Sequence, residues 1–165
     1  MKENGALTAD RVRDVLAYDP ETGRFTWRVR TGPRGVVGAR AGSQRVDGYI
    51  QIRLGRRSYL AHRLAWLYVH GAWPKGEIDH VNGGKGDNRI ANLRDVPRNL
   101  NQQNMRRAHK RSRSGLLGVG KRDGRWYARI EINDAEVWLG RFDTAQQAHE
   151  AYLAAKRQMH DGCTI

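Results

Sequence analysis

The chain has 165 residues, with 30 Lys and Arg against 17 Asp and Glu, which gives a formal net charge of +13 at pH 7. This length suits one or two small domains rather than one large core. The excess of positive charge favours a polyanionic partner, either DNA or the RNA of a ribosomal-type binder, over a merely soluble basic protein. The single cysteine, Cys163, excludes an internal disulfide and a four-cysteine zinc ribbon.

Membrane and export signals are not evident in the sequence. No apolar run approaches the roughly 18 residues of a membrane span. Residues 1–5 do not provide the apolar core of a signal peptide. We therefore expect a cytoplasmic protein with access to DNA and no membrane partner.

The N-terminal part predicts helices and hairpins in alternation. Residues 7–17 have apolar residues at helical spacing behind Thr8, a plausible N-cap. After a turn at residues 19–23, alternating apolar residues predict a strand around residues 25–29. Residues 30–48 are rich in glycine and predict a loop.

The next segment predicts a second hairpin and a helix. Ile50, Ile52 and Leu54 alternate with polar residues, and Gly55 can close a hairpin into residues 58–60. A helix follows, with leucines at helical spacing and Gly71 near its end. His62 on this helix either packs in the core or donates to DNA, and the sequence slightly favours the core.

Residues 77–108 contain the residues that are most informative about chemistry. Asp79 and His80 are adjacent, and two asparagines, Asn92 and Asn101, follow. A neutral imidazole can take a proton from water, so His80 is a candidate general base for phosphodiester hydrolysis. The Asp79 carboxylate is a hard oxygen ligand suited to Mg²⁺ or Mn²⁺. Neighbours in a strand point to opposite faces, so one site can use both only if the backbone bends nearby.

A basic segment separates this region from the C-terminal one. No acidic residue occurs between Asp95 and Asp123. Residues 109–114 read as a linker, and the one-signed charge around them favours contact with DNA phosphates over a purely solvated connection. The candidate phosphate-binding residues are Arg106, Arg107, Lys110, Arg111 and Arg113.

Residues 115–165 predict a small α+β domain. Trp126, Ala128, Ile130 and Ile132 alternate with polar residues, which predicts a strand with one apolar face. A second strand is expected over residues 136–140. Thr144 then begins a helix whose stripe of Ala148, Tyr152 and Ala155 should cover the apolar face.

Most of the sequence over residues 7–108 resembles the HNH nucleases, in particular the phage homing type. Residues 77–83 read EIDHVNG, residues 87–94 read DNRIANLR, residues 59–66 read YLAHRLAW and residues 18–27 read YDPETGRFTW. The resemblance implies a β-β-α unit with one divalent cation, Mg²⁺ or Mn²⁺, ligated by Asp79 and Asn101. It also implies that His80 activates water and that Asn92 orients the loop carrying His80. The resemblance places Asn101 on a short helix that begins near Pro97. The final signature position is Asn rather than His here, and Asn104 is a second candidate on that helix.

The C-terminal region resembles the Apetala or ethylene-response-factor type of DNA-binding domain. Residues 117–119, 126–130 and 137–144 read LGV, WYARI and VWLGRFDT. The resemblance implies a three-stranded sheet that docks in the DNA major groove, with Arg122, Arg129 and Trp138 at contacting positions. Gly120 and Glu131 stand where plant members usually have arginine, so the plant target is not transferred. The sequence leaves open whether Trp138 is exposed or at the edge of the core.

The combined prediction is an α+β protein that nicks or cleaves double-stranded DNA. We expect an N-terminal region over residues 1–76, the nuclease motif over residues 77–108, the linker and the DNA-binding domain. One site per chain predicts a single-strand nick by a monomer, whereas a double-strand cut needs dimerisation or sequential action. The alternatives are a DNA-binding regulator with an inactive nuclease half and a basic RNA-binding protein.

Overall fold

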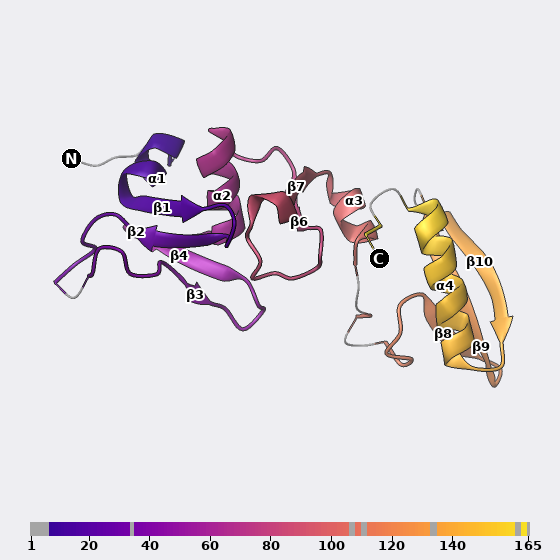
Figure 1. The fold of residues 1–165 in the computed structure, drawn as a ribbon. Helices are drawn as coiled ribbons and strands as arrows, with labels where there is room; N and C mark the ends of the chain where they lie inside the picture. The colour runs from indigo at the N-terminus through magenta and orange to yellow at the C-terminus, as the bar shows by residue number, and fades with distance from the viewer. Residues whose placement is uncertain are drawn as a thin grey trace. The chain divides into compact units, whose positions relative to one another are not determined.

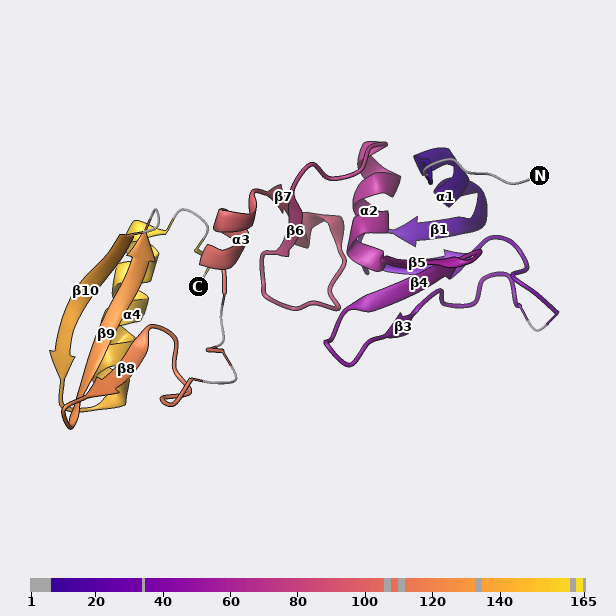
Figure 2. The same cartoon turned by 180° about the vertical axis from the view of Figure 1, so that it is seen from behind.

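The computed structural model describes residues 7–33, 35–105, 108–109, 112–132, 135–160 and 163–164. The chain divides into two compact units, Met1–Pro97 and Arg98–Ile165. Helices and small antiparallel sheets alternate along the chain, which confirms the predicted α+β class (Figures 1 and 2). The predicted boundaries of the nuclease motif and the linker stay predictions. No helix within these ranges is long and apolar enough to cross a membrane.

The first unit opens with helix α1 (Ala9–Val15) and a two-stranded ribbon, β1 (Leu16–Asp19) with β2 (Arg24–Trp27). Thr8 caps α1, because its hydroxyl accepts from the Arg11 amide at 3.3 Å. The predicted helix was too long at its end, since Leu16 is extended and pairs with Trp27. Strand pairing and complete burial of Leu16 outweigh the local helical pattern.

A three-stranded antiparallel sheet follows, in the order β3-β4-β5. Its strands are Ser43–Gln44, Ile50–Leu54 and Arg57–Leu60. The β4–β5 hairpin turns at Gly55, as predicted, whereas β3 lies inside the segment that the sequence assigned to loop. Helix α2 (Ala61–His70) then ends at Gly71, whose φ of 75° gives the left-handed cap expected of glycine.

The last ribbon of the first unit pairs β6 (Glu77–His80) with β7 (Leu93–Val96). A loop and the short 3-10 helix η1 (Ile90–Asn92) connect them. One apolar core joins α1, β2, β4, α2 and both strands of this ribbon, and its largest completely buried side chains include Phe25, Leu16, Ile52, Leu64 and Leu67. The β6–β7 ribbon is therefore supported by the body of the unit.

The second unit begins with helix α3 (Arg98–Gln103), at the place where the sequence predicts a short helix. Strands β8 (Val119–Arg122), β9 (Arg125–Ile132) and β10 (Ala135–Phe142) form an antiparallel sheet in the order β10-β9-β8. Helix α4 (Ala145–Met159) lies along the sheet in both views (Figures 1 and 2). Thr144 and Gln147 form a capping box at its start, and its predicted stripe packs on Ala128 and Ile130.

Candidate functional site

Asp79 and His80 end strand β6, and each has a separate set of neighbours. Asp79 pairs with Arg94 on β7, and Arg94 Nε and Nη2 each lie 2.7 Å from Asp79 Oδ2. Asp79 is only 6% exposed, so this ion pair compensates a buried carboxylate. The His80 ring instead packs edge-on against His62, with 5.1 Å between ring centroids.

The environment of His80 suits a proton acceptor. The residue is 5% exposed, and its Nε2 lies 3.2 Å from Asn88 Oδ1. Burial lowers the pKa of His80 below its ordinary value, and the hydrogen bond to Asn88 offsets part of that effect. The imidazole is therefore neutral near pH 7, which is the form that can accept a proton.

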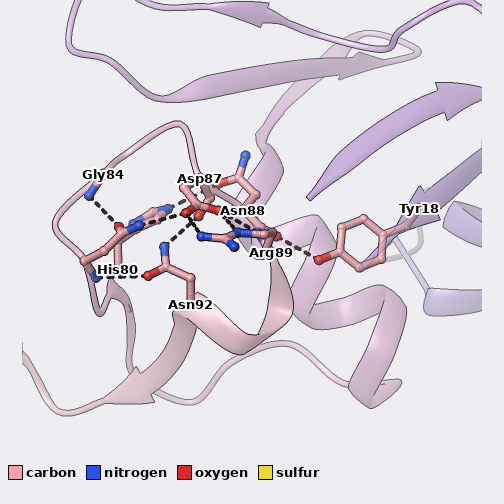
Figure 3. Close-up of polar contacts among 8 residues, drawn as sticks. Tyr18, His80, Gly84, Asp87, Asn88, Arg89 and Asn92 are labelled. Atoms are coloured by element: carbon pink, nitrogen blue, oxygen red, sulfur yellow. Dashed lines mark hydrogen bonds and ion pairs between the residues drawn. The ribbon is translucent and has the colours of Figure 1, made fainter. Parts of the chain in front are cut away.

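Asn92 ties together the two ends of the loop that follows His80 (Figure 3). Its Oδ1 accepts from the Asn82 amide at 2.9 Å, and its Nδ2 donates to the Asp87 carbonyl at 2.8 Å. Its backbone carbonyl accepts from the Val81 amide at 2.9 Å. Through these contacts Asn92 can orient the loop that follows His80. A role for Asn92 in catalysis stays a prediction.

The loop has further internal bonds around Asp87 (Figure 3). Arg89 Nε and Nη2 lie 2.8 and 2.6 Å from the two Asp87 carboxylate oxygens, and Asn82 Nδ2 donates to Asp87 at 2.7 Å. The Arg89 hydrogen bonds lower the pKa of Asp87 to about 2. Asp87, Asn88 and Arg89 lie in segment 87–94 of the HNH resemblance, although the sequence alone predicts no role for them. Their place in the motif was the available signal.

His62 lies in the core, as the sequence slightly favoured. It is 5% exposed on α2, and the Tyr49 ring lies 5.2 Å from its ring. Its Nδ1 is buried and has no hydrogen-bond partner among the described residues. Burial, followed by the charge of His80, lowers the pKa of His62 to about 3. His62 therefore stays neutral through the ordinary pH range.

This shift predicts a pH dependence of stability. Between pH 6.5 and about 3 the unfolded chain binds a proton at His62 and the folded chain does not, so stability falls as the pH decreases through this window. One such group contributes a slope of up to about 1.4 kcal/mol per pH unit. We expect His62→Gln to flatten the acid side of a plot of unfolding free energy against pH. His70→Gln, at an exposed position of the same helix, is the control and should retain the slope.

The two remaining asparagines lie in the second unit. Asn101 is half-buried on α3, and Asn104 is buried just after that helix. The Thr164 hydroxyl donates to Asn104 Oδ1. The joint ligation of one metal ion by Asn101 and Asp79 stays a prediction.

The described residues provide no large cluster of candidate metal ligands. Within the described ranges there is no group of three or more His, Cys, Asp and Glu placed to hold a metal ion. A Mg²⁺ site does not require such a group, because Mg²⁺ keeps several waters and binds through one or two carboxylates plus substrate phosphates. The Asp79 carboxylate offers an oxygen of the type that Mg²⁺ prefers, and a metal ion at Asp79 stays a prediction.

The outer face of the β8–β9–β10 sheet carries the predicted DNA-binding residues. Trp138 is 52% exposed, which decides the alternative that the sequence left open. Its ring stacks on Tyr127 at 5.1 Å and 21°. Arg129 Nη1 lies 2.5 Å from Glu136 Oε2, and its guanidinium lies over the Tyr127 ring. Arg122 is exposed beside Asp123.

The Tyr127 ring explains why position 120 on this face is glycine. A Cβ at Gly120 would lie 2.2 Å from Tyr127 Cζ, so the ring occupies the space that a side chain at 120 would need. The plant-type arginine therefore cannot be accommodated there unless Tyr127 moves.

The predicted basic segment is described only in part. Arg113 is exposed. The other predicted phosphate-binding residues lie outside the described residues: Arg106, Arg107, Lys110 and Arg111.

Comparison with known proteins separates the same two regions. A 48-residue segment, 27% of this chain, is 50% identical to "Ethylene-responsive transcription factor ERF084" from Arabidopsis thaliana. The chain spans only 19% of the length of that plant protein. No solved structure gives a significant match. Residues 59–103, which contain Asp79, His80, Asn92 and Asn101, match the family model described as HNH endonuclease, so the chain carries an HNH endonuclease domain there.

Proposed function

We propose that the protein is a divalent-metal-dependent endonuclease that nicks or cleaves double-stranded DNA. The observation that carries this proposal is His80, a buried and neutral imidazole at the end of β6 inside the HNH endonuclease match. A neutral imidazole can accept the proton of an attacking water near pH 7. The formal charge of +13 supports a polyanionic substrate.

The residues of the first unit would act as follows. His80 takes a proton from the water that attacks phosphorus, and the bond to the 3′ oxygen breaks. Asn92 keeps the loop after His80 closed through its bonds to Asn82 and Asp87. Arg94 holds the Asp79 carboxylate through Oδ2. These contacts hold the loop after His80 and the Asp79 carboxylate in place.

The metal ion enters this proposal through Asp79 and Asn101. Both side chains offer oxygen, which is the ligand type that Mg²⁺ and Mn²⁺ prefer. When bound, one such ion per chain supplies positive charge to the phosphate and the leaving oxygen. The amide of Asn101 does not titrate near neutral pH, so His80 remains the acid–base group of the site.

The second unit would hold the DNA. Arg122, Arg129 and Trp138 lie on the outer face of its sheet, and Arg113 precedes it. Guanidinium groups bind phosphate or guanine, and an exposed aromatic ring packs on sugars. The similarity to a plant transcription factor supports this assignment. One site per chain favours a single-strand nick by a monomer.

The test is relaxation of supercoiled plasmid by purified protein. We expect relaxation with Mg²⁺ or Mn²⁺, its loss when a chelator removes the metal, and its return when metal is added back. DNA binding should be followed in parallel by a gel-shift assay at several salt concentrations. Binding without relaxation with either metal would favour the DNA-binding regulator, and a preference for RNA would favour the RNA-binding alternative.

A further inference from the structure

His80 Nε2 and Asn88 Oδ1 form a buried hydrogen bond (Figure 3). Asn88 is 2% exposed, and its Oδ1 lies 3.2 Å from His80 Nε2. An amide oxygen only accepts hydrogen bonds, so His80 Nε2 must be the donor. A neutral imidazole has one N–H, and the lone pair is therefore on Nδ1.

We propose that Asn88 is a positioning residue that holds neutral His80 in the Nε2–H tautomer, so that Nδ1 is the atom that takes the proton of the attacking water. This inference rests on the proposed function, in which His80 is the general base. It adds a residue to the site and assigns the atom that accepts the proton. The opposite tautomer would place the proton on Nδ1 and the lone pair against the Asn88 oxygen, where two acceptors would face each other.

The N-terminal ribbon supports Asn88 from outside the HNH match. The Tyr18 hydroxyl donates to the Asn88 carbonyl at 2.7 Å, although the two residues are distant in sequence. Burial raises the pKa of Tyr18 to about 12, so the hydroxyl stays a donor at neutral pH. Gly23, in the turn between β1 and β2, approaches the same backbone. A Cβ on Gly23 would lie 2.4 Å from the Asn88 carbonyl carbon and 2.3 Å from the Arg89 nitrogen.

The neighbours of Asn88 in sequence restrain it as well. Asp87 Oδ1 accepts from the Arg89 amide at 3.3 Å and from Arg89 Nε at 2.8 Å, which bridges the two residues that flank Asn88. On the other side, the rings of His62 and Tyr49 lie 5.1 and 6.0 Å from the His80 ring. These contacts limit rotation of the imidazole, so the amide oxygen of Asn88 can select one tautomer.

The first arm of the test reads the tautomer and needs no nuclease activity. Long-range ¹H–¹⁵N NMR of the full chain labelled at histidine, at about pH 8 where His80 is neutral, distinguishes Nε2–H from Nδ1–H. We expect Nε2–H at His80 in the wild type and in Asn88→Asp, and a mixture of tautomers in Asn88→Ala. An Nδ1–H tautomer in the wild type would overturn the proposal, whether or not the protein cuts DNA.

The second arm measures nicking kinetics. Asn88→Ala should lower kcat on the order of 100-fold with little change in KM, because it misplaces the base without removing a DNA contact. Asn88→Asp keeps an acceptor at the same place and should recover most of the rate. Equal rates for Asn88→Ala and the wild type would overturn a positioning role, and an inactive wild type with the expected tautomer would count against the proposed function alone.

The supporting ribbon offers two matched pairs of variants. Gly23→Ala should disturb the His80 tautomer, whereas Gly55→Ala, also at positive φ but with no atom within 4 Å, should not. Tyr18→Phe removes the hydroxyl that holds Asn88, and Tyr68→Phe removes one from the same aromatic cluster. A change of tautomer in Gly23→Ala or Tyr18→Phe, but in neither control, supports the proposal. Equal behaviour within both pairs would overturn the supporting role of the ribbon.

Discussion

Replacing His80 with alanine is expected to slow metal-dependent nicking of plasmid by about 10²- to 10⁴-fold, the usual contribution of a positioned general base. The variant loses the group that takes the proton from water, while the predicted DNA-binding residues of the second unit are unchanged. Affinity for plasmid in a gel-shift assay should therefore stay close to that of the wild type. The measurement is the initial rate of conversion from supercoiled to open-circular DNA at saturating Mg²⁺ or Mn²⁺.

The controls for this variant address folding. His80 is buried among His62, Tyr49 and Asn88. Alanine at position 80 therefore leaves a cavity and removes the hydrogen-bond partner of the Asn88 side-chain amide. His80→Gln fills more of the space and should show the same loss of rate with less loss of stability. His70→Ala, at an exposed position, should cut normally. A rate within a few-fold of wild type for a folded His80→Ala protein would exclude His80 as the base.

The largest expected effect on stability comes from Gly118→Ala. Gly118 has a φ of 68°, and a Cβ there would lie 1.9 Å from Cδ2 of Tyr152, a buried residue of α4. The variant combines a left-handed backbone, which costs about 1–2 kcal/mol for alanine, with overpacking of about 1–3 kcal/mol or more. A domain of this size is stabilised by roughly 3–10 kcal/mol, so we expect the second unit to unfold partly or completely at 37 °C.

Gly115→Ala is the matched control for this prediction. Gly115 also has a φ of 68°, but no atom of the described residues lies within 4 Å of its Cβ position. The control should therefore lose only the backbone contribution, about 1–2 kcal/mol. Urea unfolding, followed by circular dichroism and by histidine and tryptophan NMR signals, compares the two variants. Equal losses would show that Tyr152 does not pack on Gly118.

The sequence determined those parts of the fold that depend on local spacing. Gly55 specified a hairpin and Gly71 a left-handed helix cap, because both turns need positive φ. Thr144 and Gln147 specified the start of α4 through a capping box. Alternation along residues 125–132 separated the buried face of β9 from the exposed one, since side chains of a strand point to opposite sides. The sequence also predicts Asp79, His80 and Asn92 as site residues, because their residue types and their order along the chain are sufficient for that prediction.

Only the tertiary structure decided which residues surround these groups. Leu16 belongs to a strand because it pairs with Trp27, and Trp138 is exposed because its ring stacks on Tyr127 rather than entering the core. Asn88 contacts His80, and Tyr18 reaches Asn88 from a distant part of the chain. Such contacts follow from the packing of separate elements. This packing produces no periodic pattern in the sequence from which the contacts could be predicted. The residue types at the site were thus readable from the sequence, whereas the partner of each polar atom was set by the fold.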